Sequence, residues 1–206
     1  MGITPDAVVA LYSGNMGAKQ GLELLADVAR LCQSSIVFVF CGNGAGRADL
    51  VQRCAGLTNV HFLDLQPMAR LGELLGMADI HLLPQRADAA DLVMPSKLTG
   101  MLASGRPVIA TAMPGTELAL VVAGQDCGVV VPPEQPQAFA SALEQLAQDK
   151  PQRTRMGLAA RRYAEANLDI DAVLGRFVAR LEGELLKRCN STGGFEPSML
   201  TDKDIH

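Results

Sequence analysis

A lysine at the start of a predicted helix is the residue whose type and place most suggest chemistry. Lys97 follows Pro95 and Ser96 in the stretch DLVMPSKLTGMLASGRPVIAT. Proline suits the first position of a helix, and the free N–H groups at such a start attract phosphate. A positive side chain in the first turn opposes the helix dipole, so an anionic ligand would explain its place. The alternative is a lysine that turns to solvent or pairs with Asp88 or Asp91.

Two glycine-rich stretches follow predicted strands and are further candidates for an anion site. The first, GNMGAKQG at residues 14–21, places Lys19 beside the start of a helix. Flexible backbone with a lysine at a helix N-terminus is a general design for anions, although the pattern G-x-x-x-x-G-K-[ST] is absent. An ordinary strand-to-helix turn with a solvated lysine explains it equally well. The second stretch, GNGAG at residues 42–46, departs from G-x-G-x-x-G and is more typical of a structural turn.

Other side chains of catalytic type lack partners at a useful spacing. His61 and His81 lie in β-rich runs, where we expect buried, hydrogen-bonded and neutral histidines. No cluster of His, Cys and Asp has zinc spacing, and the esterase pattern G-x-S-x-G is missing, so we expect no metal site and no esterase nucleophile. The segment QRTRMGLAARRY collects four arginines, Arg153, Arg155, Arg161 and Arg162. They are most simply a solvated helix face.

Length and composition bound the class of protein. The chain has 206 residues, 49% of them hydrophobic, which suffices for a sizeable core in one large or two small domains. Its formal net charge of −4 provides no basic field for nucleic acid. Five scattered cysteines without C-x-x-C spacing indicate a reduced, cytosolic chain. No apolar run approaches the roughly 18 residues of a membrane span, and the N-terminus does not resemble a signal peptide.

Short β-rich runs alternate with helical patterns along most of the chain. The predicted strands are residues 7–14, 35–42, 59–64, 79–84, 107–111 and 127–133. The intervening segments have apolar residues at helical spacing, and three further helical segments follow residue 133. Such alternation predicts an α/β fold: a doubly wound, Rossmann-like parallel sheet of about six strands with helices on both faces, plus C-terminal helices.

The predicted topology also places the candidate site. In such sheets, ligands bind at the carboxyl ends of the strands. We therefore expect the chemistry in five loops, at residues 14–19, 42–46, 64–67, 84–96 and 111–116. We expect residues 1–187 to form the domain, and the polar, aperiodic residues 188–206 to form a flexible tail.

The order of these motifs resembles the C-terminal, donor-binding domain of GT-B glycosyltransferases, within the retaining family 4 group. The resemblance covers about residues 8–168, through LYSGNMGAKQGLELLADVA, FVFCGNGAGRADL, NVHFLDLQPMARLGELLGMADIHLLP, PSKLTGMLASGRPVIAT and CGVVVPPEQPQAFASALEQL. The chain looks most like bacterial exopolysaccharide transferases of the colanic-acid type.

This resemblance implies a donor substrate, a UDP-sugar or GDP-sugar, and neither a cofactor nor a metal. Basic side chains and a helix N-terminus would neutralise the leaving diphosphate instead. The catalytic residues that it implies are Lys97 and Asp91. The implied diphosphate-binding residues are Gly14, Asn15, Lys19, Gln20, Pro95, Ser96 and Lys97. The implied nucleoside-binding residues are Gly42, Asn43, Gly44, Leu65, Gln66 and Thr99.

The chain departs from the family pattern at several positions. Gly100 stands where the family usually has the acid that holds the ribose, and Leu92 stands where it has the partner acid. Asn15 and Gln20 replace an arginine and a lysine of the first loop. We therefore expect the ribose to be bound differently, through Thr99 or through backbone, and donor affinity to be weaker or the donor to differ.

A GT-B enzyme has two Rossmann-like domains, and its acceptor binds mostly to the first. We expect this chain to be the second half of a cytoplasmic protein about twice as long, whose missing N-terminal domain binds a lipid-linked or oligosaccharide acceptor. Peripheral association with the inner face of the bacterial membrane is open only to that full-length protein. The chain alone should bind nucleotide without transferring sugar. The alternatives are a non-catalytic Rossmann-like partner subunit of a transferase and a sugar-nucleotide epimerase-like domain.

Overall fold

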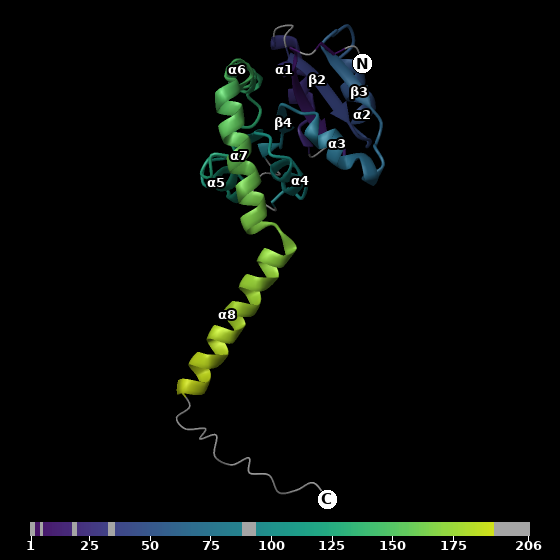
Figure 1. The fold of residues 1–206 in the computed structure, drawn as a ribbon. Coiled ribbons are helices and arrows are strands. Elements are labelled where there is room, and N and C mark those ends of the chain that lie inside the picture. The colour runs from purple at the N-terminus through teal and green to yellow at the C-terminus, as the bar shows by residue number, and fades with distance from the viewer. Residues whose placement is uncertain (1–2, 5, 18–19, 33–35, 88–93, 192–206) are drawn as a thin grey trace, which may run out of the picture. The chain divides into compact units, whose positions relative to one another are not determined.

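A computed structural model describes residues 3–4, 6–17, 20–32, 36–87 and 94–191 of the chain. The chain divides into two compact units, Met1–Glu165 and Ala166–His206 (Figure 1). The first unit contains all the predicted ligand loops. The expected domain limit at residue 187 stays a prediction.

The first unit is built on one parallel sheet of six strands. The strands are β1 (Val8–Ser13), β2 (Ile36–Cys41), β3 (Val60–Leu63), β4 (Ile80–Leu83), β5 (Val108–Thr111) and β6 (Gly128–Val131). Their order across the sheet is β3-β2-β1-β4-β5-β6, and all neighbouring pairs are parallel. The predicted doubly wound sheet is confirmed. Strands β2 and β3 lie on one side of β1, and β4, β5 and β6 lie on its other side. The order of strands therefore reverses between β1 and β4, which are neighbours although β2 and β3 separate them in sequence.

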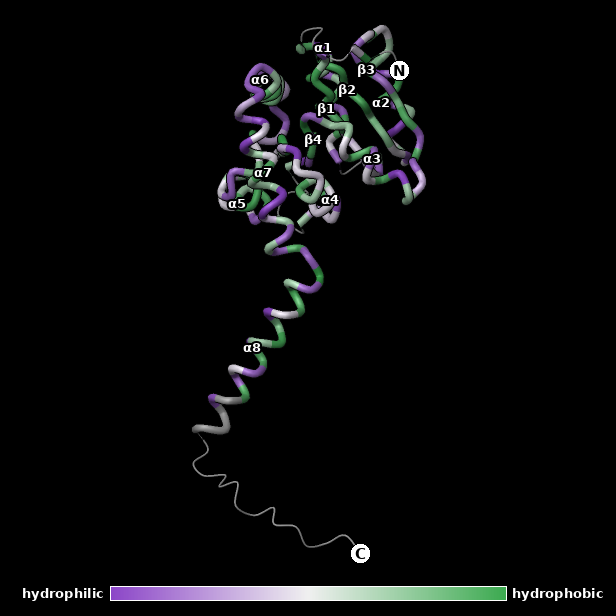
Figure 2. Tube along the Cα trace, in the orientation of Figure 1, coloured by the Kyte–Doolittle hydropathy of each residue, from purple (hydrophilic) through white to green (hydrophobic). Residues whose placement is uncertain are grey.

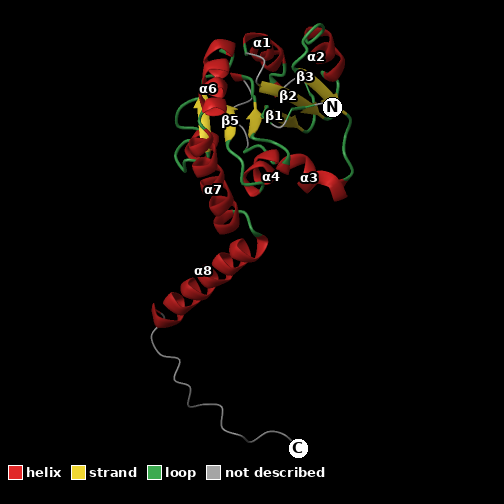
Figure 3. Ribbon diagram, turned by 45° about the horizontal axis from the view of Figure 1, so that its top comes forward, coloured by secondary structure: helices red, strands yellow, loops and turns green. Residues whose placement is uncertain are grey.

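Helices cover both faces of this sheet. The helices of the first unit are α1 (Glu23–Leu31), α2 (Arg47–Arg53), the 3-10 turn η2 (Met68–Arg70), α3 (Leu71–Gly76), α4 (Lys97–Ala103), α5 (Glu117–Val122), α6 (Pro136–Gln148) and most of α7 (Lys150–Asn167). Helices α1, α2 and α6 lie on one face, and α3 and α4 lie on the other (Figure 3). Side chains of α4, α5 and α7 share one buried cluster with β5, so these three helices cover the same face.

The strands are mostly apolar because each of their faces is covered. The tube through β1 and β2 is mostly green in Figure 2, where green marks hydrophobic residues. Along β2, Phe38 and Phe40 face the α1 and α6 side, and the intervening Val39 faces the α3 side. The Phe38 and Phe40 rings pack edge to face with centroids 6.1 Å apart. Tyr12 of β1 belongs to the same buried cluster as these two rings.

The second unit begins at Ala166 and contains helix α8 (Ile170–Ser191). The Asp169 carboxylate accepts the N–H groups of Asp171 and Ala172, which caps the start of this helix. Among the helices of the described residues, none combines the length and the hydrophobicity required to cross a membrane.

Candidate functional site

The site lies where β1 and β4 end side by side. The chain after β1 leads to α1 on one face of the sheet, and the chain after β4 leads to α4 on the other face. Such a switch point leaves a crevice at the carboxyl edge, and ligands of doubly wound sheets bind there. Lys97 begins α4, and Tyr12 lies one residue before the end of β1. The crevice therefore brings together residues 85 positions apart in sequence.

The Lys97 side chain extends into this crevice. Its Nζ donates to the Tyr12 hydroxyl over 3.1 Å and to the Gln20 Oε1 over 2.9 Å. The same ammonium lies 4.4 Å from the centre of the Tyr12 ring, within cation–π range. The Lys97 stem passes Gly14, where a Cβ would lie 3.7 Å from Lys97 Cδ. The alternative of a lysine that turns to solvent is wrong.

Burial of Lys97 lowers its pKa from 10.5 to about 8. Its hydrogen-bond partners are neutral, and none of the carboxylates in the described residues forms an ion pair with it. Asp88 and Asp91, the alternative partners, lie outside the described residues, as does Lys19. A partly desolvated cation with only neutral partners costs free energy, which an arriving anion would recover.

Tyr12 fixes the position of this lysine, and the sequence did not single it out. Its side chain is fully buried, and its hydroxyl donates to the Asn15 carbonyl over 2.5 Å while accepting from Lys97. Burial raises the pKa of Tyr12, so the phenol stays protonated and keeps its donor. A tyrosine at the carboxyl end of an otherwise apolar strand is the signal that could have identified it.

The two glycine loops are bonded to each other. The Met16 N–H donates to the Asn43 carbonyl over 2.8 Å, and the Gly46 N–H donates to the Met16 carbonyl over 2.7 Å. The Asn43 Oδ1 accepts the N–H of Gly44 over 2.8 Å, which closes a local turn. These bonds hold the loop before α1 against the loop before α2.

Glycine is required at two of these positions. Gly42 has φ +149°, and a Cβ there would lie 1.9 Å from the Gly14 carbonyl oxygen. Gly44 has φ +148°, and a Cβ there would lie 2.7 Å from the Met16 oxygen. At both positions the backbone of residues 42–46 lies directly against the backbone of residues 14–16. This contact supports the interpretation of residues 42–46 as a structural turn. Contact between Gly42, Asn43, Gly44 and a nucleoside stays a prediction.

The start of α4 differs from the sequence expectation in detail. Ser96 is the N-cap residue, so Pro95 precedes the helix and does not occupy its first position. The N–H groups of Leu98 and Thr99 donate to the Pro95 and Ser96 carbonyls over 2.9 and 3.3 Å. The expectation of free N–H groups is wrong for these two amides. The Ser96 side chain is exposed and makes no capping hydrogen bond.

The residues expected near the nucleoside lie on two separate segments. Leu65 is 64% exposed after β3, and Gln66 Nε2 donates to the Asp64 carbonyl over 2.9 Å. Thr99 is exposed on α4. A Cβ at Gly100 would lie 3.2 Å from Cδ1 of Leu75, so the glycine allows α4 to approach α3 closely. This contact gives a packing reason for glycine where the family usually has an acid.

Thr111, at the end of β5, holds the beginning of the loop between β4 and α4. Its fully buried hydroxyl accepts the Gln85 N–H over 2.6 Å and donates to the Gln85 carbonyl over 2.7 Å. One side chain thus satisfies both backbone groups of a residue two positions beyond β4. Sequence reasoning placed residue 111 in a ligand loop but did not identify this role.

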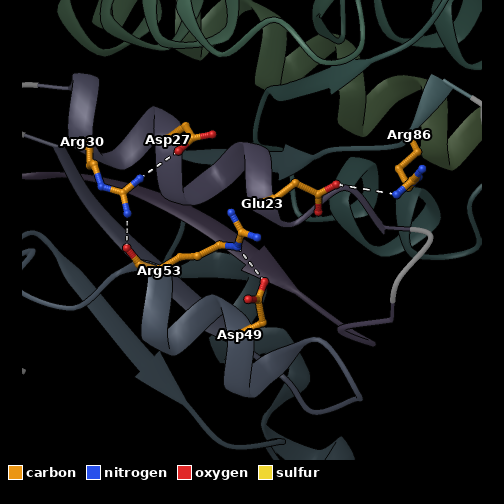
Figure 4. Close-up of polar contacts among 6 residues, drawn as sticks. All are labelled: Glu23, Asp27, Arg30, Asp49, Arg53 and Arg86. Carbon is orange, nitrogen blue, oxygen red and sulfur yellow. Dashed lines mark hydrogen bonds and ion pairs between the residues drawn. The ribbon is translucent and has the colours of Figure 1, made fainter.

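A cavity of about 160 Å³ lies beside the crevice, lined by residues of α1 and of the segments after β4 and β6. Gly21, next to Gln20, forms part of its wall. Glu23 and Arg86 also line it and form an exposed ion pair at 3.9 Å (Figure 4). Polar groups therefore surround the crevice on the α1 side.

His81 is a structural histidine at the amino end of β4. It is fully buried, and its Nε2 lies 2.9 Å from Ser104 Oγ, whose proton goes to the Met101 carbonyl. Nε2 therefore donates. Burial and the nearby Arg106 lower the pKa of His81 to about 4, so its ring is neutral. The expectation for His81 is confirmed; His61 is only partly buried.

Comparison with known families agrees with this arrangement. The family described as Glycosyl transferases group 1 matches residues 7–149. The chain belongs to this family. The match spans all six strands of the sheet, from β1 to β6, and includes the Lys97 crevice.

Two curated relatives of this group 1 domain carry transferase names. WcaI of Escherichia coli (strain K12), a candidate colanic acid biosynthesis glycosyl transferase, is 39% identical over 184 residues, which cover 85% of this chain and 43% of WcaI. The D-inositol 3-phosphate glycosyltransferase of Corynebacterium diphtheriae is 31% identical, over 80% of this chain and 40% of the relative. The chain therefore spans less than half the length of either relative.

Solved structures share the fold of this group 1 domain. The Anabaena protein Alr3699/HepE in complex with UDP has a TM-score of 0.73 at 17% identity, covering 86% of this chain and 49% of that protein. WaaG, a glycosyltransferase involved in lipopolysaccharide biosynthesis, has a TM-score of 0.65 at 22% identity, covering 81% of this chain and 45% of that protein. These likenesses confirm the GT-B type of Rossmann-like fold.

Proposed function

We propose that this domain binds a nucleotide-diphosphate sugar in the crevice between β1 and β4, as the donor-binding half of a glycosyltransferase of cell-surface polysaccharide synthesis. The observation that carries the proposal is the partly buried Lys97 ammonium, whose hydrogen-bond partners among the described residues, Tyr12 and Gln20, are both neutral. Family membership supports the reaction class. The names of WcaI and of WaaG support a polysaccharide or lipopolysaccharide product.

The diphosphate is the part of the ligand that suits Lys97. An anion beside the ammonium stabilises its charged form, so binding raises the pKa of Lys97 above its value of about 8. When the glycosidic bond to the leaving diphosphate breaks, negative charge grows on the β-phosphate. A positioned cation stabilises that developing charge without reorganising. Gly14, Asn15, Lys19, Gln20, Pro95 and Ser96 complete the proposed diphosphate site.

The remaining assignments are proposals of the same kind. The reaction would be retaining and independent of metal and cofactor, with Asp91 as a second catalytic residue outside the described part of the chain. The nucleoside would lie between the loop of Leu65 and Gln66 and the first turn of α4 at Thr99. UDP is favoured as the nucleotide because Alr3699/HepE, which shares the fold, was solved with UDP and with UDP-glucose.

The acceptor and the setting concern the whole protein. The chain covers 43% of WcaI, so a lipid-linked or oligosaccharide acceptor would bind mainly to a domain outside this chain. We propose a cytoplasmic enzyme that works at the inner face of the bacterial membrane. Sugar transfer would then require the full-length protein.

A thermal-shift panel tests the proposed function. UDP, GDP, ADP and dTDP, each with a metal chelator, are added to the chain up to millimolar concentration. We expect one or two of them to raise the melting temperature, because a ligand that binds only the folded state stabilises it. If none does so, the proposed donor site is wrong. A response that requires added Mg²⁺ would overturn the metal-independent assignment.

A further inference from the structure

Helix α7 presents a cationic stripe to solvent that the proposed donor site does not use. Positions three or four residues apart share one face of a helix. The buried face of α7 consists mainly of small residues, and its exposed face contains Lys150, Thr154, Arg155, Leu158, Arg161 and Arg162. We name these six residues the α7 surface. Leu158, which is 60% exposed, lies in the middle of them.

Two adjoining depressions lie along this surface, and both are lined by cations. A hollow of about 270 Å³ has Arg106, Arg153 and Arg161 in its wall. A second depression, shallow, open to solvent and lined by α7 alone, has Arg155 and Arg162 along it. Lys150, Thr154 and Leu158 line both.

Some of these cations have structural partners. Arg153 donates to the Leu146 carbonyl over 2.7 Å at the end of α6, and Arg161 donates to the Ala103 carbonyl over 2.6 Å at the end of α4. These two arginines therefore stabilise helix ends as well as carrying charge. The packing beneath them is close, since a Cβ at Gly157 would lie 2.3 Å from the Gly105 carbonyl oxygen.

The carboxylates near this surface leave it positive. Arg155 pairs with Asp126, and Arg161 pairs with Glu165 at 2.6 Å, and all four side chains are about half exposed. The other nearby carboxylates are Asp79, which accepts the Val9 N–H, and Asp149, which accepts the Gln152 N–H. Lys150, Arg106, Arg153 and Arg162 form no ion pair with any carboxylate of the described residues.

The surface lies away from the donor crevice. The hollow lined by Arg106, Arg153 and Arg161 is also lined by Asp79 and Pro107, which immediately precede β4 and β5. These positions are at the amino edge of the sheet, whereas Lys97 and Gln20 meet at its carboxyl edge. A partner on the α7 surface would therefore leave the crevice open to a nucleotide.

We propose that the α7 surface docks this domain itself onto an anionic phospholipid bilayer, in contrast to the expectation from sequence that only the full-length protein associates with a membrane. Its chemistry matches such a bilayer in two respects. Clustered Lys and Arg side chains are attracted to a negatively charged leaflet, and an exposed Leu158 among them adds apolar burial at the headgroup boundary.

The positive patch occurs on a chain of net charge −4, so the attraction is local to one face. A bilayer suits the flat distribution of charge along one helix, without base-stacking aromatics, better than a nucleic acid. The biological setting rests on the proposed function, but the binding itself does not.

Vesicle co-sedimentation tests the docking surface. The full chain is mixed with vesicles of phosphatidylcholine alone or of phosphatidylcholine with phosphatidylglycerol. We expect binding to the anionic vesicles only, and loss of that binding as salt is raised, because exposed charges are screened. The variant K150Q/R155Q/R162Q should lose on the order of 100-fold in vesicle affinity, from about five-fold per charge removed. Arg153 and Arg161 are left intact because they hold helix ends.

A matched variant controls for net charge. R53Q/R70Q/K187Q removes the same charge from exposed side chains of α2, η2 and α8, of which Arg53 is shown in Figure 4. It should bind anionic vesicles as the wild type does. Equal binding by both triple variants, equal binding to the two kinds of vesicle, or no binding by the wild type would each overturn the proposal. So would an RNA oligonucleotide that binds more tightly than the vesicles and is released by K150Q/R155Q/R162Q.

The result is separable from the proposed function. K150Q/R155Q/R162Q should keep the nucleotide thermal shift of the wild type, because the crevice is at the opposite edge of the sheet. If K150Q/R155Q/R162Q loses vesicle binding but keeps the nucleotide-dependent thermal shift, the docking surface is supported. If the wild type binds nucleotide but no vesicles, only the docking inference is wrong. Vesicle binding without nucleotide binding sinks only the proposed donor site.

Discussion

The ammonium of Lys97 lies 4.4 Å from the centre of the Tyr12 ring and 3.1 Å from its hydroxyl oxygen. The lysine comes from the first turn of α4 and the tyrosine from β1, on either side of the switch point of the sheet. Because the tyrosine is buried and bonded to the Asn15 carbonyl, it is a fixed support for a side chain that would otherwise have many rotamers. The charge is thus held at the carboxyl edge by contacts within the protein.

Replacing Tyr12 by Phe should weaken this support while keeping the ring. The substitution removes the acceptor for Lys97 and the donor to Asn15, so we expect the free energy of unfolding to fall by about 0.5–1.5 kcal/mol. Nucleotide affinity should fall because Lys97 is less well positioned. Tyr12→Leu, which also removes the cation–π contact, should cost more in both measurements. Urea titration and nucleotide binding by both variants check this, and unchanged affinity in Tyr12→Leu would contradict it.

The affinity for UDP should depend on pH above about 8. In the free protein the pKa of Lys97 is about 8, so the lysine is charged below that pH and neutral above it. Binding requires the charged form and raises its pKa, so affinity is nearly constant between about pH 7 and pH 8 and above that falls by up to about tenfold per unit. The diphosphate itself is fully ionised from about pH 7 upward. Calorimetry across this range, with Lys97→Met as the control that lacks the decline, measures the effect. A decline of the same size in the variant would assign it to another group.

Thr111 should matter more through its hydroxyl than through its methyl group. Thr111→Val keeps the shape but removes both bonds to Gln85, leaving the partly buried N–H and carbonyl of Gln85 without these partners, at a cost of about 1–3 kcal/mol. Thr111→Ser restores the hydroxyl and should recover most of the loss. Faster amide hydrogen exchange at Gln85 in Thr111→Val is the local readout. Equal stability of the two variants would mean that the bonds do not hold the loop.

The contact between Gly100 and Leu75 leads to a specificity test. Glutamate at position 100 supplies the acid that the family usually has there, and the Leu75 side chain must shift by a few tenths of an ångström to admit its Cβ. If the ribose lies beside α4, Gly100→Glu should bind UDP at least tenfold more tightly, as expected of a charge-assisted hydrogen bond. The gain should vanish with 2′,3′-dideoxy-UDP. Gly100→Ala is the control for the backbone effect of losing glycine, and an equal gain there would contradict the ribose explanation.

The sheet could be predicted from sequence because its signals are local. Runs such as Val8–Ser13 and Ile36–Cys41 are almost entirely apolar. The segments between them have apolar residues three or four positions apart, which is the spacing of a helix. Lys97 stood out because a lysine opposes the dipole in the first turn of a helix. These patterns need no knowledge of which residues meet in space.

The partners within the site could not be predicted in the same way. Tyr12 and Lys97 are 85 positions apart, and Thr111 and Gln85 are 26 apart, so only the strand order brings them together. The close contact of Gly42 and Gly44 with the backbone of residues 14–16 could not be predicted either, because the sequence indicated a turn there but not the segment against which it packs. Two of the amides expected to be free at the start of α4, those of Leu98 and Thr99, donate within short-range turns, which periodicity does not reveal.

Calorimetry tests the central claim most directly. UDP is titrated into the wild type and into Lys97→Met at pH 7.0, which is about one unit below the pKa of Lys97. Lys187→Met, an exposed lysine of α8, is the matched control. The account predicts that Lys97→Met loses about 10- to 150-fold in affinity, the value of one charge-assisted contact, while Lys187→Met binds as the wild type does. Equal affinity of wild type and Lys97→Met for UDP, with the variant folded, would contradict the assignment of the crevice as the diphosphate site.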